Sequence, residues 1–162
     1  MRIDALQKPQ GRWCEHCTTR RACDIYDIRP CECREFYCGY LTFSGLGDEW
    51  KPSKSKMVLV SELGGQRLAA HVHPHTPDAW RREPYHSQLR NFATMAAQHH
   101  EHVIVCIGKR TFVILPDRDV DLGVVDDDDR IIVGEMHTPF GVKLEAYKMN
   151  KDDPRLRKQK ED

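Results

Sequence analysis

Six of the seven cysteines lie within one stretch of 25 residues near the start of the sequence. They are Cys14, Cys17, Cys23, Cys31, Cys33 and Cys38. Thiolates crowded in this way, and opening on a C-x2-C pair, are typical of a site for a soft metal cation. Disulfides are the alternative, but they need an oxidising compartment, and the seventh cysteine, Cys106, leaves an odd number. The spacing therefore predicts an N-terminal metal-binding segment.

The metal is expected to be zinc. A structural zinc takes four ligands in a closed tetrahedron, so Cys14 and Cys17 would form the first pair. The second pair would come from the four later cysteines, with His16 as a weaker candidate, and six thiolates could also hold two zinc ions through shared sulfurs. An iron–sulfur cluster, which also needs only four thiolates, is the alternative cofactor. Either would stabilise residues 12–40, which hold few large aliphatic side chains, by coupling metal binding to folding.

Two local resemblances concern the same segment. The order of the six cysteines loosely resembles the binuclear zinc clusters of fungal transcription activators, with Thr18–Arg21 at the place of their basic loop. The string from Cys14 to Cys23, C-x2-C-x5-C, is similar to the cluster-binding segment of a group of iron–sulfur nucleases and to part of the cluster-binding domain of some radical enzymes. Each likeness covers a short piece of the chain, and no nuclease core accompanies the second. They imply metal chemistry and no further function.

A second group of candidate ligands consists of His71, His73 and His75. Residues 71 and 73 would point to the same face of a strand, and Glu62 and Asp78 are the carboxylates nearest in sequence. An H-x-H pair can hold a metal that acidifies a water for attack, which makes a metal-dependent hydrolase or nuclease the alternative function. The other interpretation is that these histidines are structural, because the H-x-H pair is not part of a longer metal-binding motif.

Other candidates for chemistry are weaker. His99, His100 and His102 follow the end of a predicted helix, where the helix dipole favours histidine without any catalytic role. Cys106 lies in an apolar run and is expected to be buried and a poor nucleophile. The sequence holds no P-loop, nucleophile elbow or dinucleotide-binding fingerprint. The motifs therefore favour a binding protein over an enzyme.

The best candidate for a contact surface combines basic and aromatic side chains in the middle of the chain. Its members are Trp80, Arg81, Arg82, Tyr85, Arg90, Lys109 and Arg110. Such residues suit phosphates and stacked bases, or an acidic protein face. The competing interpretation is a solvated helix face. The run Asp126–Asp129 lacks the spacing of an EF-hand and is expected to be a solvated loop.

The net charge of zero, from 25 basic and 25 acidic residues, hides an uneven distribution. Residues 51–115 carry nine basic against four acidic side chains and seven of the nine histidines. Residues 116–150 carry four basic against nine acidic ones. A neutral whole is not an obvious nucleic-acid binder, but a dipolar molecule could present one positive face to an anionic partner.

The elements that must position these residues form an α+β fold. We predict an antiparallel sheet of about six strands, with hairpins turning at Gly64-Gly65, Gly108-Lys109 and Pro139-Phe140, and a helical insert. The insert would begin with a helix capped by Thr76, followed by a longer helix over about 85–98. The predicted organisation is a cysteine module (1–45), a linker anchored by Trp50 (46–56), an α+β domain (57–150) and a charged tail (151–162).

Together these features predict an intracellular, zinc-stapled binding protein, a regulator or accessory factor that contacts nucleic acid or an acidic protein surface. No apolar run reaches the roughly 20 residues of a membrane span, and residues 1–10 lack the apolar core of a secretory signal. We therefore expect a cytoplasmic location and no membrane. The alternatives are the histidine-dependent hydrolase or nuclease, and a structural, assembly or iron–sulfur protein.

Overall fold

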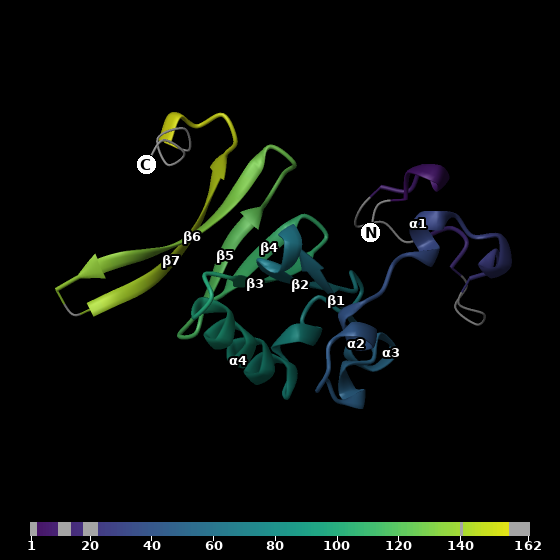
Figure 1. Cartoon of the computed structure of the whole chain (residues 1–162), viewed down its shortest axis with the longest axis horizontal. Coiled ribbons are helices and arrows are strands. Elements are labelled where there is room, and N and C mark those ends of the chain that lie inside the picture. The colour runs from purple at the N-terminus through teal and green to yellow at the C-terminus, as the bar shows by residue number, and fades with distance from the viewer. Residues whose placement is uncertain (1–2, 10–13, 18–22, 140, 156–162) are drawn as a thin grey trace.

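The computed structural model describes residues 3–9, 14–17, 23–139 and 141–155. Its centre is a five-stranded sheet in which neighbouring strands are consecutive in the sequence (Figure 1): β1 Met57–Glu62, β2 Arg67–Val72, β3 His102–Ile107, β4 Arg110–Ile114 and β5 Asp119–Val124. A two-stranded sheet follows, formed by β6 Asp129–Thr138 and β7 Gly141–Asn150. The helices are α1 Cys31–Arg34, α2 Gly39–Thr42, α3 Pro52–Ser55 and α4 Tyr85–Ala97. The predicted α+β class is confirmed.

The three predicted hairpins are present. β1 and β2 pair antiparallel around Gly64 and Gly65, which both have positive φ (67° and 104°), a conformation that suits glycine. β3 and β4 pair around Gly108 and Lys109. β6 and β7 pair from Asp129↔Asn150 to Thr138↔Gly141, and position 140 of their predicted turn lies outside the described residues.

The prediction of one antiparallel sheet of about six strands is wrong in two respects. β2 and β3 pair parallel, because α4 crosses from the end of one strand to the start of the other. The β6–β7 hairpin forms its own sheet and does not extend the first one. The insert also differs: the longer helix is confirmed as α4, but the residues after Thr76 form turns and a short 3₁₀ turn at Ala79–Arg81.

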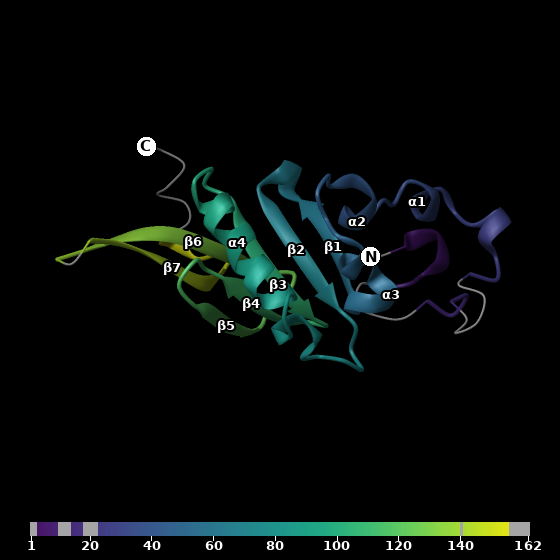
Figure 2. The same cartoon turned by 90° about the horizontal axis from the view of Figure 1, so that it is seen from below.

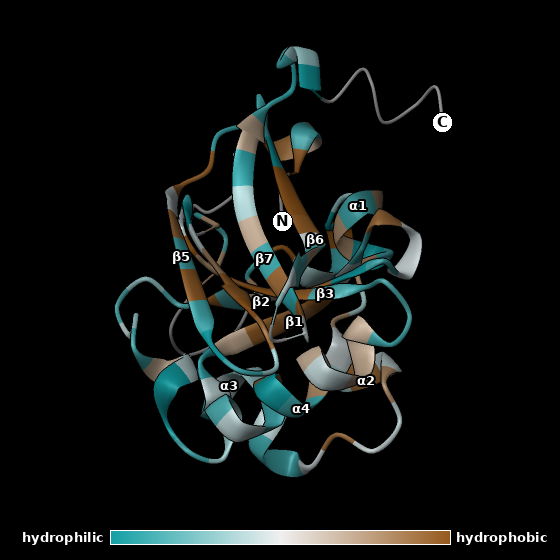
Figure 3. Ribbon diagram, turned by 90° about the vertical axis from the view of Figure 1, so that its left-hand side faces the viewer, coloured by the Kyte–Doolittle hydropathy of each residue, from teal (hydrophilic) through white to brown (hydrophobic). Residues whose placement is uncertain are grey.

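Helix α4 lies against one face of the five-stranded sheet (Figures 1 and 2), and one apolar cluster lies on each face of the sheet. The larger lies beneath α4, where an apolar stripe of Tyr85, Leu89, Phe92 and Ala96 packs against the sheet. The smaller joins the other face to the hairpin, through Ala69, Ile104, Val113, Leu115 and Ala146. Because both faces are covered, the central strands are hydrophobic over most of their length, as their brown colour in Figure 3 shows.

Residues 39–56, part of them predicted as a linker, pack on the larger cluster. Trp50 is 1% exposed, and Tyr40, Phe43 and Leu46 pack beside the cluster. A Cβ on Gly39 would lie 2.8 Å from the Cβ of Leu59, so only glycine permits this close approach of α2 to β1. The C-terminal end of the cysteine segment is therefore anchored to the sheet. No helix in the described part of the chain is long and apolar enough to cross a membrane.

Candidate functional site

The cysteine segment begins with a tight turn. The amide N–H of Cys17 donates to the carbonyl of Cys14 (3.0 Å), and the N–H of Asp24 donates to the carbonyl of His16 (3.0 Å). The second bond holds the chain around Cys23 beside the turn. The ring of His16 lies 3.3 Å from the carboxylate of Asp24, so this candidate ligand has a partner already. Residues 18–22, where the basic loop was predicted, lie outside the described residues.

Helix α1 separates the next two cysteines. Residues two apart on a helix point about 200° apart, so Cys31 and Cys33 cannot face one point. The thiol of Cys31 is exposed and donates to Oε1 of Glu35 (3.0 Å), and this hydrogen bond raises the pKa of Cys31. Burial raises the pKa of Cys33, and Cys14 and Cys23 add to the rise. The thiol of Cys33 therefore shares its surroundings with Cys14 and Cys23.

The described part of the cysteine segment has no hydrophobic core. Of the described residues between 14 and 38, none is fully buried, and no disulfide joins the six cysteines there. Within the described residues, no three His, Cys, Asp or Glu side chains are arranged to hold a metal ion. The predicted metal-binding module is therefore not confirmed. The fold brings three thiols into one neighbourhood without closing them on a common point.

The predicted histidine group divides into two parts. Nε2 of His71 lies 3.3 Å from Oε1 of Glu62, which also binds Arg67 (2.7 Å). This hydrogen bond from His71, with help from Arg67, lowers the pKa of Glu62 to about 2. His73 lies beyond the end of β2, and its ring stacks near that of His75, with 5.5 Å between centroids. The alternation that would align residues 71 and 73 ends with the strand.

Most side chains of the predicted basic and aromatic contact surface have partners within the chain. Trp80 is fully buried, and the hydroxyl of Tyr85 donates to the carbonyl of Glu49 (3.0 Å). Both rings are thus occupied within the chain. Four of the predicted cations have carboxylate partners, and Arg82 is exposed. The ion pairs are Arg81–Asp119, Arg90–Asp119, Lys109–Asp126 and Arg110–Asp121.

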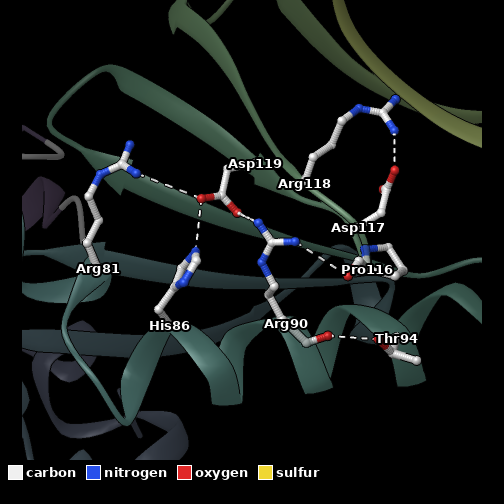
Figure 4. A network of polar contacts seen from close by, with 8 residues as sticks. All are labelled: Arg81, His86, Arg90, Thr94, Pro116, Asp117, Arg118 and Asp119. Atoms are coloured by element: carbon white, nitrogen blue, oxygen red, sulfur yellow. Dashed lines mark hydrogen bonds and ion pairs between the residues drawn. The ribbon is translucent and has the colours of Figure 1, made fainter.

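Asp119, at the start of β5, is the centre of a polar network that the sequence did not reveal (Figure 4). Its carboxylate lies 2.9 Å from Nε2 of His86, 3.1 Å from the guanidinium of Arg90 and 3.8 Å from that of Arg81. The side chain is 14% exposed. Asp119, from the acidic stretch 116–150, therefore neutralises cations of the basic stretch 51–115 at this face. No local motif marks Asp119, because Arg90 lies 29 positions before it in the sequence.

Cys106 is half-buried, and burial raises its pKa to about 11. The side chain is thus less buried than expected. Because only the thiolate is nucleophilic, the raised pKa disfavours Cys106 as a nucleophile.

A cavity of about 430 Å³ is lined by residues of the β1–β2 turn, of the loop after α2 and of the C-terminal part of α4. Its walls are mostly apolar and include Phe43, Leu68, Phe92 and Val103. The lining also includes polar residues, among them His102. Sequence reasoning missed the cavity and assigned His102 to a helix end, whereas it is the first residue of β3.

Comparisons with protein-family models, with curated proteins and with solved structures found no match to this chain.

Proposed function

We propose that the chain is a zinc-stapled binding protein in which Cys14, Cys17, Cys23 and Cys33 bind one zinc ion. The observation that carries this proposal is that the described residues between 14 and 38 bury no side chain, yet the thiols of Cys14 and Cys23 are near enough to Cys33 to raise its pKa. A segment without a core must be stabilised by something else. Zinc bound to four thiolates supplies that stabilisation, because binding and folding are coupled.

The choice of four ligands follows from where the other two thiols lie. Cys31 bonds Glu35 on the opposite side of α1 from Cys33. Cys38 immediately precedes Gly39, which is held against β1. Cys17 closes the hydrogen-bonded turn that begins at Cys14, which is the geometry that lets a C-x2-C pair bind one ion.

The same segment offers a surface for a protein partner. It carries four large apolar side chains that are 60–79% exposed: Tyr26, Ile28, Tyr37 and Leu41. Exposed aromatic and aliphatic groups of this kind are enriched at protein interfaces. Four of the five cations of the predicted contact surface are paired with Asp119, Asp121 or Asp126, so a protein partner is favoured over nucleic acid.

Metal analysis of the purified full-length chain tests the proposal. We expect one zinc per chain, and Co²⁺ substitution should give the intense visible bands of a tetrahedral thiolate site. Cys33→Ser and Cys14→Ser should lose the metal, whereas the matched control Cys31→Ser should keep it. The ligand set would be refuted if the chain bound no metal, or if Cys33→Ser lost the metal while Cys14→Ser kept it. A brown protein containing iron would instead establish the iron–sulfur alternative.

The hydrolase alternative has no comparable support. His71 is engaged by Glu62 and His73 by His75, so they do not converge on one ion in this structure.

A further inference from the structure

Arg29, in the cysteine segment, has buried hydrogen-bond donors that lack an acceptor. Its Nε and Nη1 atoms are buried and have no hydrogen-bond partner in the part of the chain that the structure describes. Buried polar atoms nearly always have a partner, and a buried cation without one is costly because a guanidinium cannot lose its charge. Since both atoms are shielded from solvent, their acceptor is expected among the groups that pack beside them.

The position of Arg29 is fixed from two sides. The central carbon of its guanidinium lies 3.7 Å from the centre of the Tyr26 ring, so this ring covers one face of the planar group. The carbonyl of Arg29 accepts a hydrogen bond from Nε of Arg34 (3.0 Å), which ties it to α1. Stacking engages the face of a guanidinium, and its N–H groups point outward in the plane, where an acceptor can meet them.

The cysteine thiols are the candidate acceptors in this neighbourhood. Pro30, the residue after Arg29, accepts a hydrogen bond from the amide of Cys33 (3.0 Å), so Cys33 lies within one helical turn. Burial and the thiols of Cys14 and Cys23 raise the pKa of Cys33, and the positive charge of Arg29 opposes that rise. The guanidinium therefore shares its surroundings with three of the four proposed zinc ligands.

Binding of zinc would turn these thiols into strong acceptors. A neutral thiol accepts hydrogen bonds weakly, whereas a thiolate is charged and forms the stronger, charge-assisted kind. Four thiolates around one Zn²⁺ also leave two negative charges uncompensated, which a neighbouring cation offsets. We infer that the guanidinium of Arg29 donates hydrogen bonds through Nε and Nη1 to the zinc-bound thiolates, that of Cys33 among them. This inference rests on the zinc site proposed above.

Two substitutions in the full-length chain separate the charge of Arg29 from its donors. Arg29→Met removes the charge and the N–H groups, and Arg29→Lys keeps the charge but loses the planar fork. Groups that hydrogen-bond to metal ligands typically contribute about 10–100-fold to metal affinity. In competition with a chromophoric chelator, we expect Arg29→Met to bind zinc about 10–100-fold more weakly than the wild-type chain, with Arg29→Lys between them. The control Arg82→Met, at an exposed position outside the cysteine segment, should bind zinc as the wild-type chain does.

The spectrum of the Co²⁺-substituted chain distinguishes hydrogen bonding from a merely structural role. An N–H donor lowers the energy of the sulfur electrons, so its loss in Arg29→Met should move the sulfur-to-cobalt charge-transfer band to longer wavelength. Circular dichroism checks folding, and if Arg29→Met does not fold, wild-type values of affinity and band position in Arg29→Lys would overturn the inference.

The outcomes separate this inference from the zinc proposal. An unchanged affinity in Arg29→Met, or a weakened affinity with an unmoved band, would overturn the role of Arg29 and leave the zinc site standing. A wild-type chain that binds no zinc would overturn both.

Discussion

The cysteine segment and the sheet are built by different physical means. The sheet buries apolar side chains on both faces, beneath α4 and beneath the β6–β7 hairpin. The described residues between 14 and 38 bury none, although the segment carries six of the seven cysteines. The contrast teaches that apolar burial can stabilise most of a chain while one segment has little of it. Under the zinc proposal, metal binding by the thiols would stabilise that segment instead.

The largest expected effect is the loss of core packing. Leu89→Ala removes a fully buried side chain beneath α4 and should lower the free energy of unfolding by about 2–5 kcal/mol. Ile28→Ala, in the cysteine segment, alters a side chain that is 79% exposed. It should change the free energy of unfolding by less than about 0.5 kcal/mol. Urea denaturation followed by tryptophan fluorescence measures both. Equal effects would show that the cysteine segment has packing that the structure does not contain.

Breaking an ion pair at the sheet should lower the free energy of unfolding more than breaking one in the cysteine segment. Asp119→Asn leaves Arg90, Arg81 and His86 without their carboxylate in a place where the aspartate is 14% exposed, and should cost about 1–3 kcal/mol. Asp24→Asn breaks the pair with His16, where the aspartate is 50% exposed, and should cost less than about 0.5 kcal/mol. The same denaturation measurement compares them. A larger cost for Asp24→Asn would contradict the division between the two regions.

The smallest expected effect depends on pH. The pKa of His102 is about 4 in the folded chain, below its ordinary 6.5, so the unfolded chain binds a proton first as pH falls. The stability that the neutral ring provides is complete above pH 6.5 and is lost between pH 6.5 and 4. We expect a loss of about 1–2 kcal/mol, less than the full shift implies because the side chain is partly exposed.

His102→Gln is the control for this pH dependence, since glutamine does not titrate. Its stability should be flatter over pH 6.5–4. The contribution of Glu62, whose pKa is lowered to about 2 from 4.5, is present above pH 4.5 and is lost as pH falls toward 2. The two groups therefore act in mostly separate windows. If stability fell equally steeply between pH 6.5 and 4 in the wild-type chain and in His102→Gln, the pH dependence would belong to groups other than His102.

Local features of this fold could be predicted from the sequence, and non-local ones could not. The hairpin at Gly64 and Gly65 and the stripe that includes Leu89 depend on residues only a few positions apart. The parallel pairing of β2 with β3 and the separate β6–β7 sheet depend on tertiary packing, which periodicity does not encode.

The candidate sites follow the same rule. Cysteine spacing indicated which residue types could bind metal, but not that α1 would turn Cys31 away from Cys33. Asp119 meets Arg90 across 29 positions of sequence, and no motif joins them. The cavity is lined from three separate parts of the chain, so only the folded arrangement reveals it.

The crossover through α4 also has a consequence for the order of folding. The hairpins β1–β2, β3–β4 and β6–β7 close over short loops, whereas β2–β3 pairing, from Arg67↔His102 to His71↔Cys106, must close a loop that contains the whole of α4. Closing the longer loop costs more chain entropy before any contact repays it. We expect the parallel pairing and the docking of α4 to form together, late and cooperatively, so that the rate-limiting step of folding is the joining of preformed hairpins.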